Sequence, residues 1–369
     1  MTPGPGAVSG AVPGEGPGAP APELLARARL LVAPGLSASL VRELERITGR
    51  GAEPLVDGVT AGGRLLTADG PLLCVGAVLP DALRTDRLFW FHSVNAGTDP
   101  LLAAGPWPAG ALLTRTVGRM GERIAQYVLG WVLAECQAVP EYVAQHSRAE
   151  WRRLPTELVA GQTALVYGTG RIGGAVAGLL RSCGVRTVGV GRTARTGAAP
   201  AGFDRVIGAG FDRVVGAEAG PEAGAGVKAG LGVEAGADAG AEAEELAGAR
   251  WVVAALPLTG ATEGFFGAGR FAAMRGATFV NVGRGATVDP VALEGALRSG
   301  GVRRAVLDVL PEEPAAPGDP VWRLPRTVIT SHSAGITADE DVAQDFAACW
   351  EAVAAGRRPE LTVDTGRGY

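Results

Sequence analysis

Three side chains that could do chemistry follow strand-like apolar runs in the second half of the chain. Arg284 follows TFVNV, Glu313 lies a few residues beyond RAVLDV, and His332 stands in TVITSHSAG. Because the carboxyl ends of parallel strands meet at one edge of a sheet, we expect these side chains to face one crevice. A histidine transfers protons near neutral pH, a carboxylate beside it fixes its tautomer, and an arginine binds a carboxylate through two parallel hydrogen bonds. The set therefore suits proton transfer on a substrate that carries a carboxylate.

Each of these residues alone also has an ordinary structural interpretation. Arg284 could be a charge at a helix end, Glu313 a turn acid beside proline, and His332 a hydrogen-bonded polar residue. We favour the catalytic interpretation because all three occur together downstream of a cofactor motif. The other histidines, His92 and His146, have no comparable setting.

The glycine-rich turn GTGRIG predicts a site for a nicotinamide dinucleotide. It follows the apolar strand TALVY and opens the helical segment IGGAVAGLLRSCG. The first glycine permits a tight turn, the second lets the backbone approach the pyrophosphate, and the third lets the helix pack closely on the sheet. Free N–H groups at the helix N-terminus bind the anion, whereas an ordinary strand-to-helix turn would need none of this. The predicted cofactor contacts in the turn are Gly168, Gly170, Arg171, Ile172 and Gly173.

The end of the next strand favours NADP over NAD. Dinucleotide folds that prefer NAD place an acid about 20 residues past the turn, where it binds the ribose 2′-hydroxyl. Here the strand RTVGV ends in Gly191, Arg192, Thr193, Ala194 and Arg195, which offer guanidinium and hydroxyl donors. Such donors suit a 2′-phosphate. If the two arginines are merely solvated surface charges, NAD stays a possible cofactor.

The segments that would position these groups alternate between strand-like and helical patterns. From Thr163 onward this alternation is typical of a doubly wound parallel sheet covered by helices on both faces. Shorter alternating runs from Ala28 indicate a smaller first domain. The amphipathic segment GERIAQYVLGWVLAECQAV lies between the two and is expected to cross from one to the other.

These patterns divide the chain into domains. We expect a disordered tail at 1–22, a substrate domain at 23–118 and 334–369, and a dinucleotide-binding domain at 119–333. Within the last, AGFDRVIG is nearly repeated as AGFDRVVG and is followed by a low-complexity stretch, so that an insert occupies about 209–243. Glycine is too frequent there for a stable helix, and we expect a mobile surface loop.

Composition excludes several classes of partner. A net charge of −4 without a basic stripe argues against nucleic acid and anionic membranes. The first residues do not form a secretory signal and no apolar run reaches about 18 residues, which predicts a cytoplasmic location. The cysteines are scattered, so we expect neither a metal site nor disulfides. A small molecule is the expected ligand.

From about Phe89 to Tyr369 the chain resembles the D-isomer-specific 2-hydroxyacid dehydrogenase family. The resemblance is carried by motifs in family order: HSVNAGTD, GTGRIG, LPLTGAT, FVNVGRGATVD, VLDVLPEEP and TSHSAG. It implies a Rossmann cofactor domain inserted in a smaller, flavodoxin-like α/β substrate domain, in a homodimer. It also implies hydride transfer between NAD(P)H and C2 of a small 2-oxo acid or D-2-hydroxy acid.

The resemblance implies a role for each candidate residue. Arg284 would hold the substrate carboxylate with help from the backbone at Val75 and Gly76, while His332 would be the acid/base and Glu313 its partner. The further cofactor contacts that it implies are Leu256, Pro257, Thr262, Val282 and, at the nicotinamide carboxamide, Asp308.

Some features depart from the family pattern or leave alternatives open. Gln126 stands where an acid is common, Asn95 replaces a glycine or alanine before AGTD, and the insert is unusual. The identity of the 2-oxo acid stays open. Two other functions are considered on the same fold: a non-enzymatic NAD(P)-sensing regulatory protein, and a formate-type dehydrogenase, in which glutamine usually replaces the partner of the base.

Overall fold

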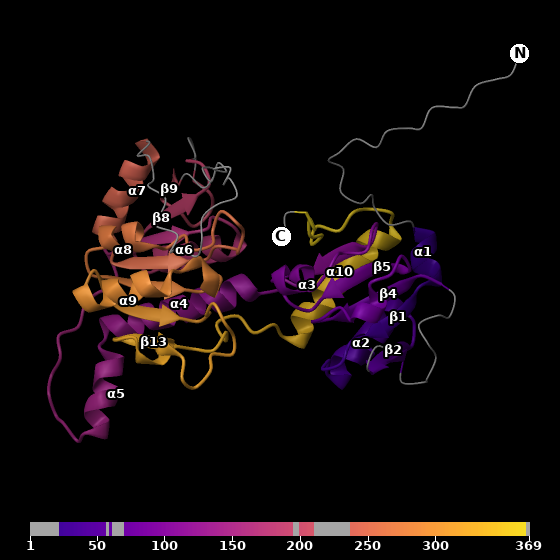
Figure 1. Ribbon diagram of the computed structural model, residues 1–369, viewed down its shortest axis with the longest axis horizontal. Helices are drawn as coiled ribbons and strands as arrows, with labels where there is room; N and C mark the ends of the chain where they lie inside the picture. Colours follow the sequence, from indigo (N-terminus) through magenta and orange to yellow (C-terminus); the bar gives the residue numbers. More distant parts are fainter. Residues whose placement is uncertain (1–21, 57–58, 61–69, 195–198, 210–236, 367–369) are drawn as a thin grey trace, which may run out of the picture. The chain divides into compact units, whose positions relative to one another are not determined.

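The computed structural model describes residues 22–56, 59–60, 70–194, 199–209 and 237–366 (Figure 1). The predicted tail at 1–22 lies outside the described residues, except for residue 22. Arg195 and most of the predicted insert also lie outside them. The chain divides into two compact units, one of Met1–Gly118 with Thr337–Tyr369 and one of Arg119–Ile336. Each unit is built on its own sheet.

The second unit contains a seven-stranded parallel sheet. The chain starts in the middle of this sheet, runs outward to one edge, returns to the middle and runs outward to the other. The predicted doubly wound Rossmann architecture is therefore confirmed. From edge to edge, the strands are β9 (Arg205–Gly208), β8 (Arg186–Gly191), β7 (Thr163–Tyr167), β10 (Trp251–Ala254), β11 (Ala277–Asn281), β12 (Val302–Leu307) and β13 (Thr327–Ile329).

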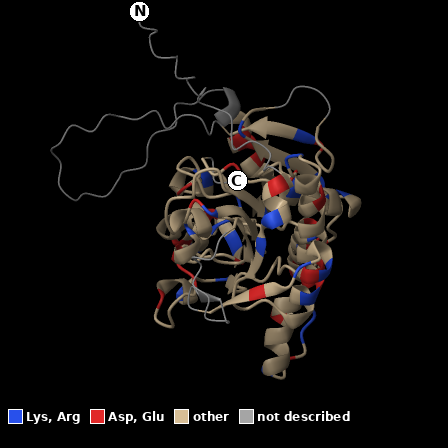
Figure 2. Cartoon of the chain, turned by 90° about the vertical axis from the view of Figure 1, so that its right-hand side faces the viewer, with Lys and Arg blue, Asp and Glu red and all other residues tan. Residues whose placement is uncertain are grey.

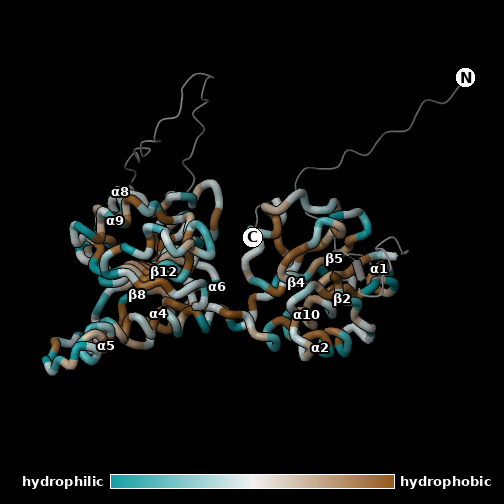
Figure 3. The backbone as a smooth tube through the Cα atoms, turned by 60° about the horizontal axis from the view of Figure 1, so that its bottom comes forward, coloured by the Kyte–Doolittle hydropathy of each residue, from teal (hydrophilic) through white to brown (hydrophobic). Residues whose placement is uncertain are grey.

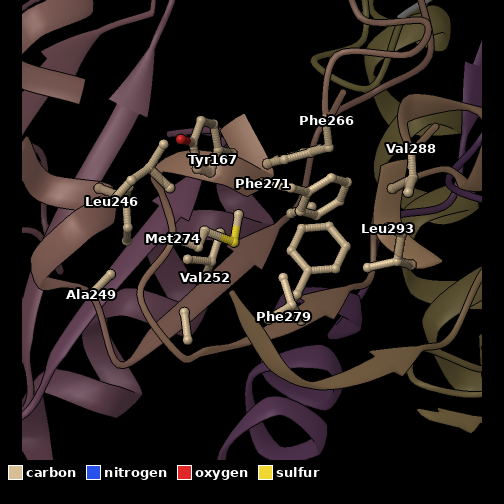
Figure 4. Packing of buried hydrophobic residues seen from close by; sticks show 14 of the residues in the cluster. Tyr167, Leu246, Ala249, Val252, Phe266, Phe271, Met274, Phe279, Val288 and Leu293 are labelled. Atoms are coloured by element: carbon tan, nitrogen blue, oxygen red, sulfur yellow. The ribbon is translucent and has the colours of Figure 1, made fainter. Parts of the chain in front are cut away.

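Helices cover both faces of this sheet because alternate strand residues point to opposite sides. Ala164 and Val166 of β7 pack with α4 and α6, whereas Leu165 and Tyr167 pack with α7, α8 and α9. Figure 4 shows the second of these cores, in which Phe271 and Phe279 lie against one another. The helices are α4 (Met120–Cys136), α5 (Val139–Ser147), α6 (Arg171–Ser182), α7 (Ala237–Gly248), α8 (Ala268–Ala273) and α9 (Pro290–Ser299).

The prediction of a loop through residue 243 is wrong for its last residues. Residues 237–243 form the first part of α7, and this end of the predicted insert has four alanines, the strongest helix formers, and only one glycine. The buried side chain of Glu242 explains the helix: its Oε1 accepts hydrogen bonds from the Tyr167 hydroxyl at 2.8 Å and from Arg270 Nε at 2.7 Å. Burial raises the pKa of the Tyr167 hydroxyl, which therefore stays a donor.

A second buried acid holds the same helix. Glu245 accepts two hydrogen bonds from Arg186 of β8, at 2.8 and 2.9 Å, and also pairs with Arg205 of β9. Leu246 beside it is buried in the core. Tertiary contacts of this kind add to the helix propensity that alanine and glutamate already give this segment.

The first unit contains a six-stranded sheet. Its parallel strands have the order 2-1-3-4-5, which is the flavodoxin-like order that we predicted, and β3 adds an antiparallel edge. From edge to edge, the strands are β3 (Val59–Thr60), β2 (Ala52–Val56), β1 (Arg29–Val32), β4 (Leu72–Gly76), β5 (Leu88–Ser93) and β6 (Leu112–Arg115).

The two ends of the chain meet in this unit. Leu40 and Leu44 share a core with Phe346 and Val353 of the C-terminal helix, and Trp90 stacks on Phe346 with ring centroids 5.4 Å apart. The second unit is thereby inserted into the first unit, as the predicted fold class requires. The helices of the first unit are α1 (Pro22–Arg27), α2 (Ala38–Thr48), α3 (Asp99–Ala103) and α10 (Asp339–Ala354).

Hydrophobicity and charge are distributed as this architecture demands. The hydrophobic stretches of the chain follow the strands of both sheets (Figure 3). Acidic and basic residues are intermingled along the helices rather than gathered by sign (Figure 2). Among the helices of the described ranges, none combines the length and apolarity that crossing a bilayer requires.

Candidate active site

The strand register of the second unit aligns six strand ends in one row. Residues paired across neighbouring strands in this row are Val190, Tyr167, Ala254, Asn281, Leu307 and Ile329. Every predicted cofactor or catalytic residue of this unit lies in a segment that leaves the sheet just beyond the row. The sheet thus brings them to a single edge, where ligands bind in folds of this type.

The glycine turn lies at the centre of this edge, between β7 and α6. Gly168 has φ +100, and a Cβ there would lie 2.6 Å from the carbonyl oxygen of Ala255. A Cβ on Gly173 would lie 1.7 Å from the carbonyl oxygen of Gly168. In contrast, among the described residues other than its chain neighbours, none has an atom within 4 Å of a Cβ placed on Gly170. Two glycines therefore allow the turn to close, and the third leaves open space beside the start of α6.

The neighbouring strand end lacks an acid in the structure, as in the sequence. Arg192 and Thr193 directly follow β8, and both are exposed. Gly191 approaches the turn closely, since a Cβ on it would lie 3.4 Å from Oγ1 of Thr169. Basic and hydroxyl groups therefore stand next to the glycine turn, where an NAD-preferring site would have a carboxylate.

The segment after β10 is a loop held by its own hydrogen bonds. The buried hydroxyl of Thr262 donates to the carbonyl oxygen of Pro257 at 2.7 Å and accepts from the amide of Thr259 at 2.8 Å. Leu256 is buried, and a Cβ on Gly283 would lie 2.6 Å from its carbonyl oxygen. Thr262 therefore shapes this loop, and Val282, which is buried as well, follows β11 beside it.

Arg284 is half-buried and follows β11 in extended conformation. Its Nη1 donates to the carbonyl oxygen of Gly283 at 2.8 Å, and its own carbonyl accepts from the Thr287 hydroxyl at 2.6 Å. A Cβ on the next residue, Gly285, would lie 1.8 Å from the carbonyl carbon of Leu310. The loop that carries Arg284 therefore packs directly on the segment that leads to Glu313.

The structure brings Glu313 and His332 into contact. Oε2 of Glu313 lies 2.7 Å from Nδ1 of His332, and Oε1 accepts from the Leu310 amide at 2.8 Å. Because a carboxylate only accepts, Nδ1 of the imidazole carries the proton in this contact. The imidazole is about half exposed, at 53% of its side chain, so its other nitrogen can meet a ligand.

The turn that carries His332 is held by a residue to which we had assigned another role. Oδ1 of the buried Asp308 accepts from the Thr330 hydroxyl at 2.6 Å and from the amides of Ser333 and Ala334 at 2.9 and 3.1 Å. Its backbone carbonyl accepts from the amide of His332 at 2.6 Å. The predicted contact with a nicotinamide carboxamide stays a prediction. A carboxylate directly after a strand, followed by a TSHS motif, is the only sequence signal for this arrangement.

The backbone of this turn is strained. Ser331 and His332 have φ values of +55 and +56, in the left-handed region that non-glycine residues rarely adopt. Such residues cost about 1–3 kcal/mol each and persist where the surroundings hold them. The four hydrogen bonds to Asp308 supply that hold.

The residues predicted to bind the substrate carboxylate through their backbone lie in the first unit. Val75 and Gly76 end β4, and both are buried. A Cβ on Gly76 would lie 2.3 Å from Cβ of Ala33, so the position requires glycine. Asn95, a departure from the family pattern, forms a turn in which its amide donates to the Ser93 hydroxyl at 3.1 Å.

His92, in the same strand-end region, is a structural residue. Its ring is fully buried between the hydroxyls of Thr114 and Thr116, at 2.8 and 3.1 Å. Burial lowers the pKa of this imidazole to about 3. His92 is therefore neutral at physiological pH, which leaves His332 as the histidine at the sheet edge described above.

Comparisons with known proteins agree with this geometry. Residues 129–209 and 233–334 match the NAD binding domain of the D-isomer specific 2-hydroxyacid dehydrogenases, with an interruption that falls in the predicted insert. An uncharacterised protein of Streptomyces coelicolor is 54% identical over 302 residues, 82% of this chain and 97% of that protein. Glyoxylate/hydroxypyruvate reductase A of Serratia proteamaculans is 29% identical over 290 residues, 77% of this chain and 82% of the reductase.

A solved structure is similar as well. A D-isomer specific 2-hydroxyacid dehydrogenase of Xanthobacter autotrophicus, in complex with NADPH and MES, has 27% sequence identity and a TM-score of 0.72. The match covers 93% of this chain and all of that chain.

The glycine turn yields the first prediction. Gly170→Ala should leave thermal unfolding unchanged, because its Cβ enters open space, but should weaken NADPH binding at least about tenfold by blocking the approach of the pyrophosphate. Gly173→Ala should lower stability and binding together, since its Cβ meets the Gly168 carbonyl. NADPH fluorescence titration and thermal melts measure both effects. Wild-type affinity in Gly170→Ala would contradict the placement of the pyrophosphate.

Proposed function

Since the chain belongs to the D-isomer specific 2-hydroxyacid dehydrogenase family, whose members are oxidoreductases, we propose that it reduces a small 2-oxo acid to the D-2-hydroxy acid with NADPH. The observation that carries the proposal is the hydrogen bond between Glu313 and His332, at the same sheet edge as the glycine turn and Arg284. NADPH supplies the hydride when bound. The protein must bind, orient and protonate the substrate.

His332 is the proton donor in this proposal. Glu313 fixes the proton on Nδ1, so that Nε2 of the protonated ring donates to the oxygen that develops negative charge at C2. Because Glu313 is itself held by the Leu310 amide, the ring has a defined orientation before substrate arrives. A pure NAD(P) sensor has no need of such a pair, and a formate-type enzyme would usually have glutamine in place of Glu313.

Arg284 binds the substrate carboxylate. A guanidinium offers two parallel N–H donors, which fix the acid in one orientation and so place its carbonyl. The predicted contribution of the Val75 and Gly76 backbone to carboxylate binding stays a prediction. The name of the Serratia relative supports glyoxylate or hydroxypyruvate as the size class of substrate.

The residues around the glycine turn fit NADP. The open space at Gly170 and the start of α6 suit a pyrophosphate, and exposed Arg192 and Thr193 suit a 2′-phosphate. The NADPH complex of the similar Xanthobacter enzyme supports this choice. We propose that Leu256, Pro257, Thr262 and Val282 line the remainder of the cofactor site.

The chemical roles are tested by two substitutions in an NADPH-oxidation assay against a panel of 2-oxo acids. His332→Ala should lower kcat about 100- to 10,000-fold with NADPH affinity unchanged, because only the proton donor is lost. Arg284→Ala should lower kcat/KM at least about 10- to 100-fold, mainly through weaker substrate binding. Arg298→Ala, which changes an exposed residue of α9 that pairs with Glu294, is the control. Unchanged turnover in His332→Ala would remove the catalytic assignment.

Arg192 tests the cofactor preference. Arg192→Ala should raise the KM for NADPH about 10- to 100-fold while the KM for NADH stays constant, because only NADPH has the phosphate that the guanidinium binds. Arg298→Ala, an exposed arginine of α9 that pairs with Glu294, should affect neither cofactor. Equal catalytic efficiency of the wild type with both cofactors would contradict the preference.

We also propose a homodimer formed through α5 and the segment that follows it. Figure 1 shows α5 extending away from the body of its unit. Val143 and Leu158 are 66% and 82% exposed, and Trp151 is fully exposed. Exposed apolar side chains gathered in this way mark association surfaces, and tryptophan is a frequent anchor in them.

The base of this projecting segment is rigid, which suits an interface. Glu135, buried at the end of α4, accepts from Arg303 at 2.7 Å and from Thr278 at 2.8 Å, and pairs with Arg250. Glu157 pairs with Arg250 as well. The ion pairs hold both ends of the segment against the sheet.

Light scattering tests the proposed assembly. Trp151→Glu should convert a dimer to a monomer at micromolar concentration, because a charge replaces the central apolar contact. Val291→Glu, which changes an exposed residue of α9 in the same unit, should leave the mass unchanged. A monomeric wild-type protein would contradict the homodimer.

A further inference from the structure

A tyrosine of α4 reaches the turn that carries the proposed acid/base. The Tyr127 hydroxyl lies 2.6 Å from Oγ1 of Thr330, although the two residues are 203 positions apart. We propose that Tyr127 is a positioning residue for His332, acting through Thr330 and Asp308. This inference rests on the proposed function for the role of His332, but its structural core can be tested without turnover.

The directions of the hydrogen bonds define a continuous series of donors and acceptors. Thr330 has one hydroxyl proton, and the carboxylate of Asp308 can only accept, so Thr330 donates to Asp308 at 2.6 Å. Oγ1 of Thr330 must then accept from the hydroxyl of Tyr127. The series of hydrogen bonds therefore runs from Tyr127 through Thr330 to Asp308, and each bond strengthens the next.

Asp308, the last acceptor in this series of hydrogen bonds, holds the strained turn. Asp308 accepts from the amides of Ser333 and Ala334, on the far side of His332, through the same oxygen that Thr330 binds. It also accepts from the amide of His332 itself. If the carboxylate shifts, the left-handed conformation of Ser331 and His332 loses its support. The ring would then no longer be presented to Glu313 in one orientation.

Tyr127 is suited to act as a permanent donor. Burial raises the pKa of its hydroxyl to about 12, so the proton is retained throughout the physiological range. Its ring packs edge-to-face on Trp131, with centroids 6.4 Å apart. That packing does not need the hydroxyl. The hydroxyl also has a side-chain hydrogen bond with Trp131, so Tyr127→Phe removes both polar contacts while it keeps the ring contact, and Thr330→Val removes the contact with Thr330 alone.

Kinetics separates a positioning role from simple packing. Tyr127→Phe should lower kcat about tenfold, the effect of one lost buried hydrogen bond, with the KM for NADPH unchanged. Thr330→Val should match it, and Thr330→Ser, which restores the hydroxyl, should recover most of the rate. Tyr142→Phe is the matched control, because the Tyr142 hydroxyl accepts from the Leu154 amide on the projecting segment. Wild-type kcat in Tyr127→Phe would overturn the proposal.

Imidazole NMR gives a readout that does not depend on activity. The chain has only three histidines, so the full-length protein labelled with 15N-histidine gives few signals, and His332→Ala identifies the relevant one. In the wild-type protein the neutral ring should be the Nδ1–H tautomer, because Glu313 accepts that proton. Tyr127→Phe should shift the ring toward a mixture of both tautomers, whereas Tyr142→Phe should not.

The two readouts distinguish failure of the inference from failure of the proposed function. A wild-type protein that turns over no 2-oxo acid, but whose His332 tautomer changes in Tyr127→Phe, removes the reductase and supports the positioning role. An unchanged tautomer in a folded Tyr127→Phe protein overturns the positioning role, whatever the rate.

Discussion

The parallel register of the seven-stranded sheet is the constraint on which the site depends. Pairing from Val190 to Ile329 sets six strand ends side by side, so that segments far apart in sequence leave the sheet at one edge. The backbone hydrogen bonds between the strands produce this alignment, and it does not require contacts among the functional side chains. Close contacts between loops, such as that between Gly285 and Leu310, then fix the positions of the segments that leave the strands.

Much of this arrangement could be predicted because its signals are local. The glycine turn, the missing acid beside Arg192 and the motifs around Arg284 and His332 each lie within a few residues of a strand end, and the predicted fold class and family are confirmed. Cofactor contacts and catalytic roles stay predictions, because they concern ligands. The turn residues show the limit: nothing near Asp308 in sequence reveals that its carboxylate holds Ser333 and Ala334.

The prediction that failed, and the contact that the sequence could not reveal, both involve partners distant along the chain. Helix α7 begins inside the predicted loop, where alanine and glutamate favour a helix, and Glu242 and Glu245 anchor it through arginines from other elements. Tyr127 of α4 meets Thr330, the residue that directly follows β13. Local propensity carries no information about either contact. In both cases the sequence gives one hint of such a partner, namely a helical side chain whose polar group has no evident partner nearby in sequence.

The anchoring of α7 has a consequence for how this chain can vary in length. Because two buried glutamates of α7 pair with arginines of β8, β9 and α8, the sheet does not depend on how many residues join β9 to α7. The entropic cost of joining two fixed ends of a chain grows only slowly with the number of residues between them, by roughly 0.6 kcal/mol for each doubling. The family match is interrupted at this point, which is therefore a natural place for evolution to add sequence and for an engineer to graft a reporter domain.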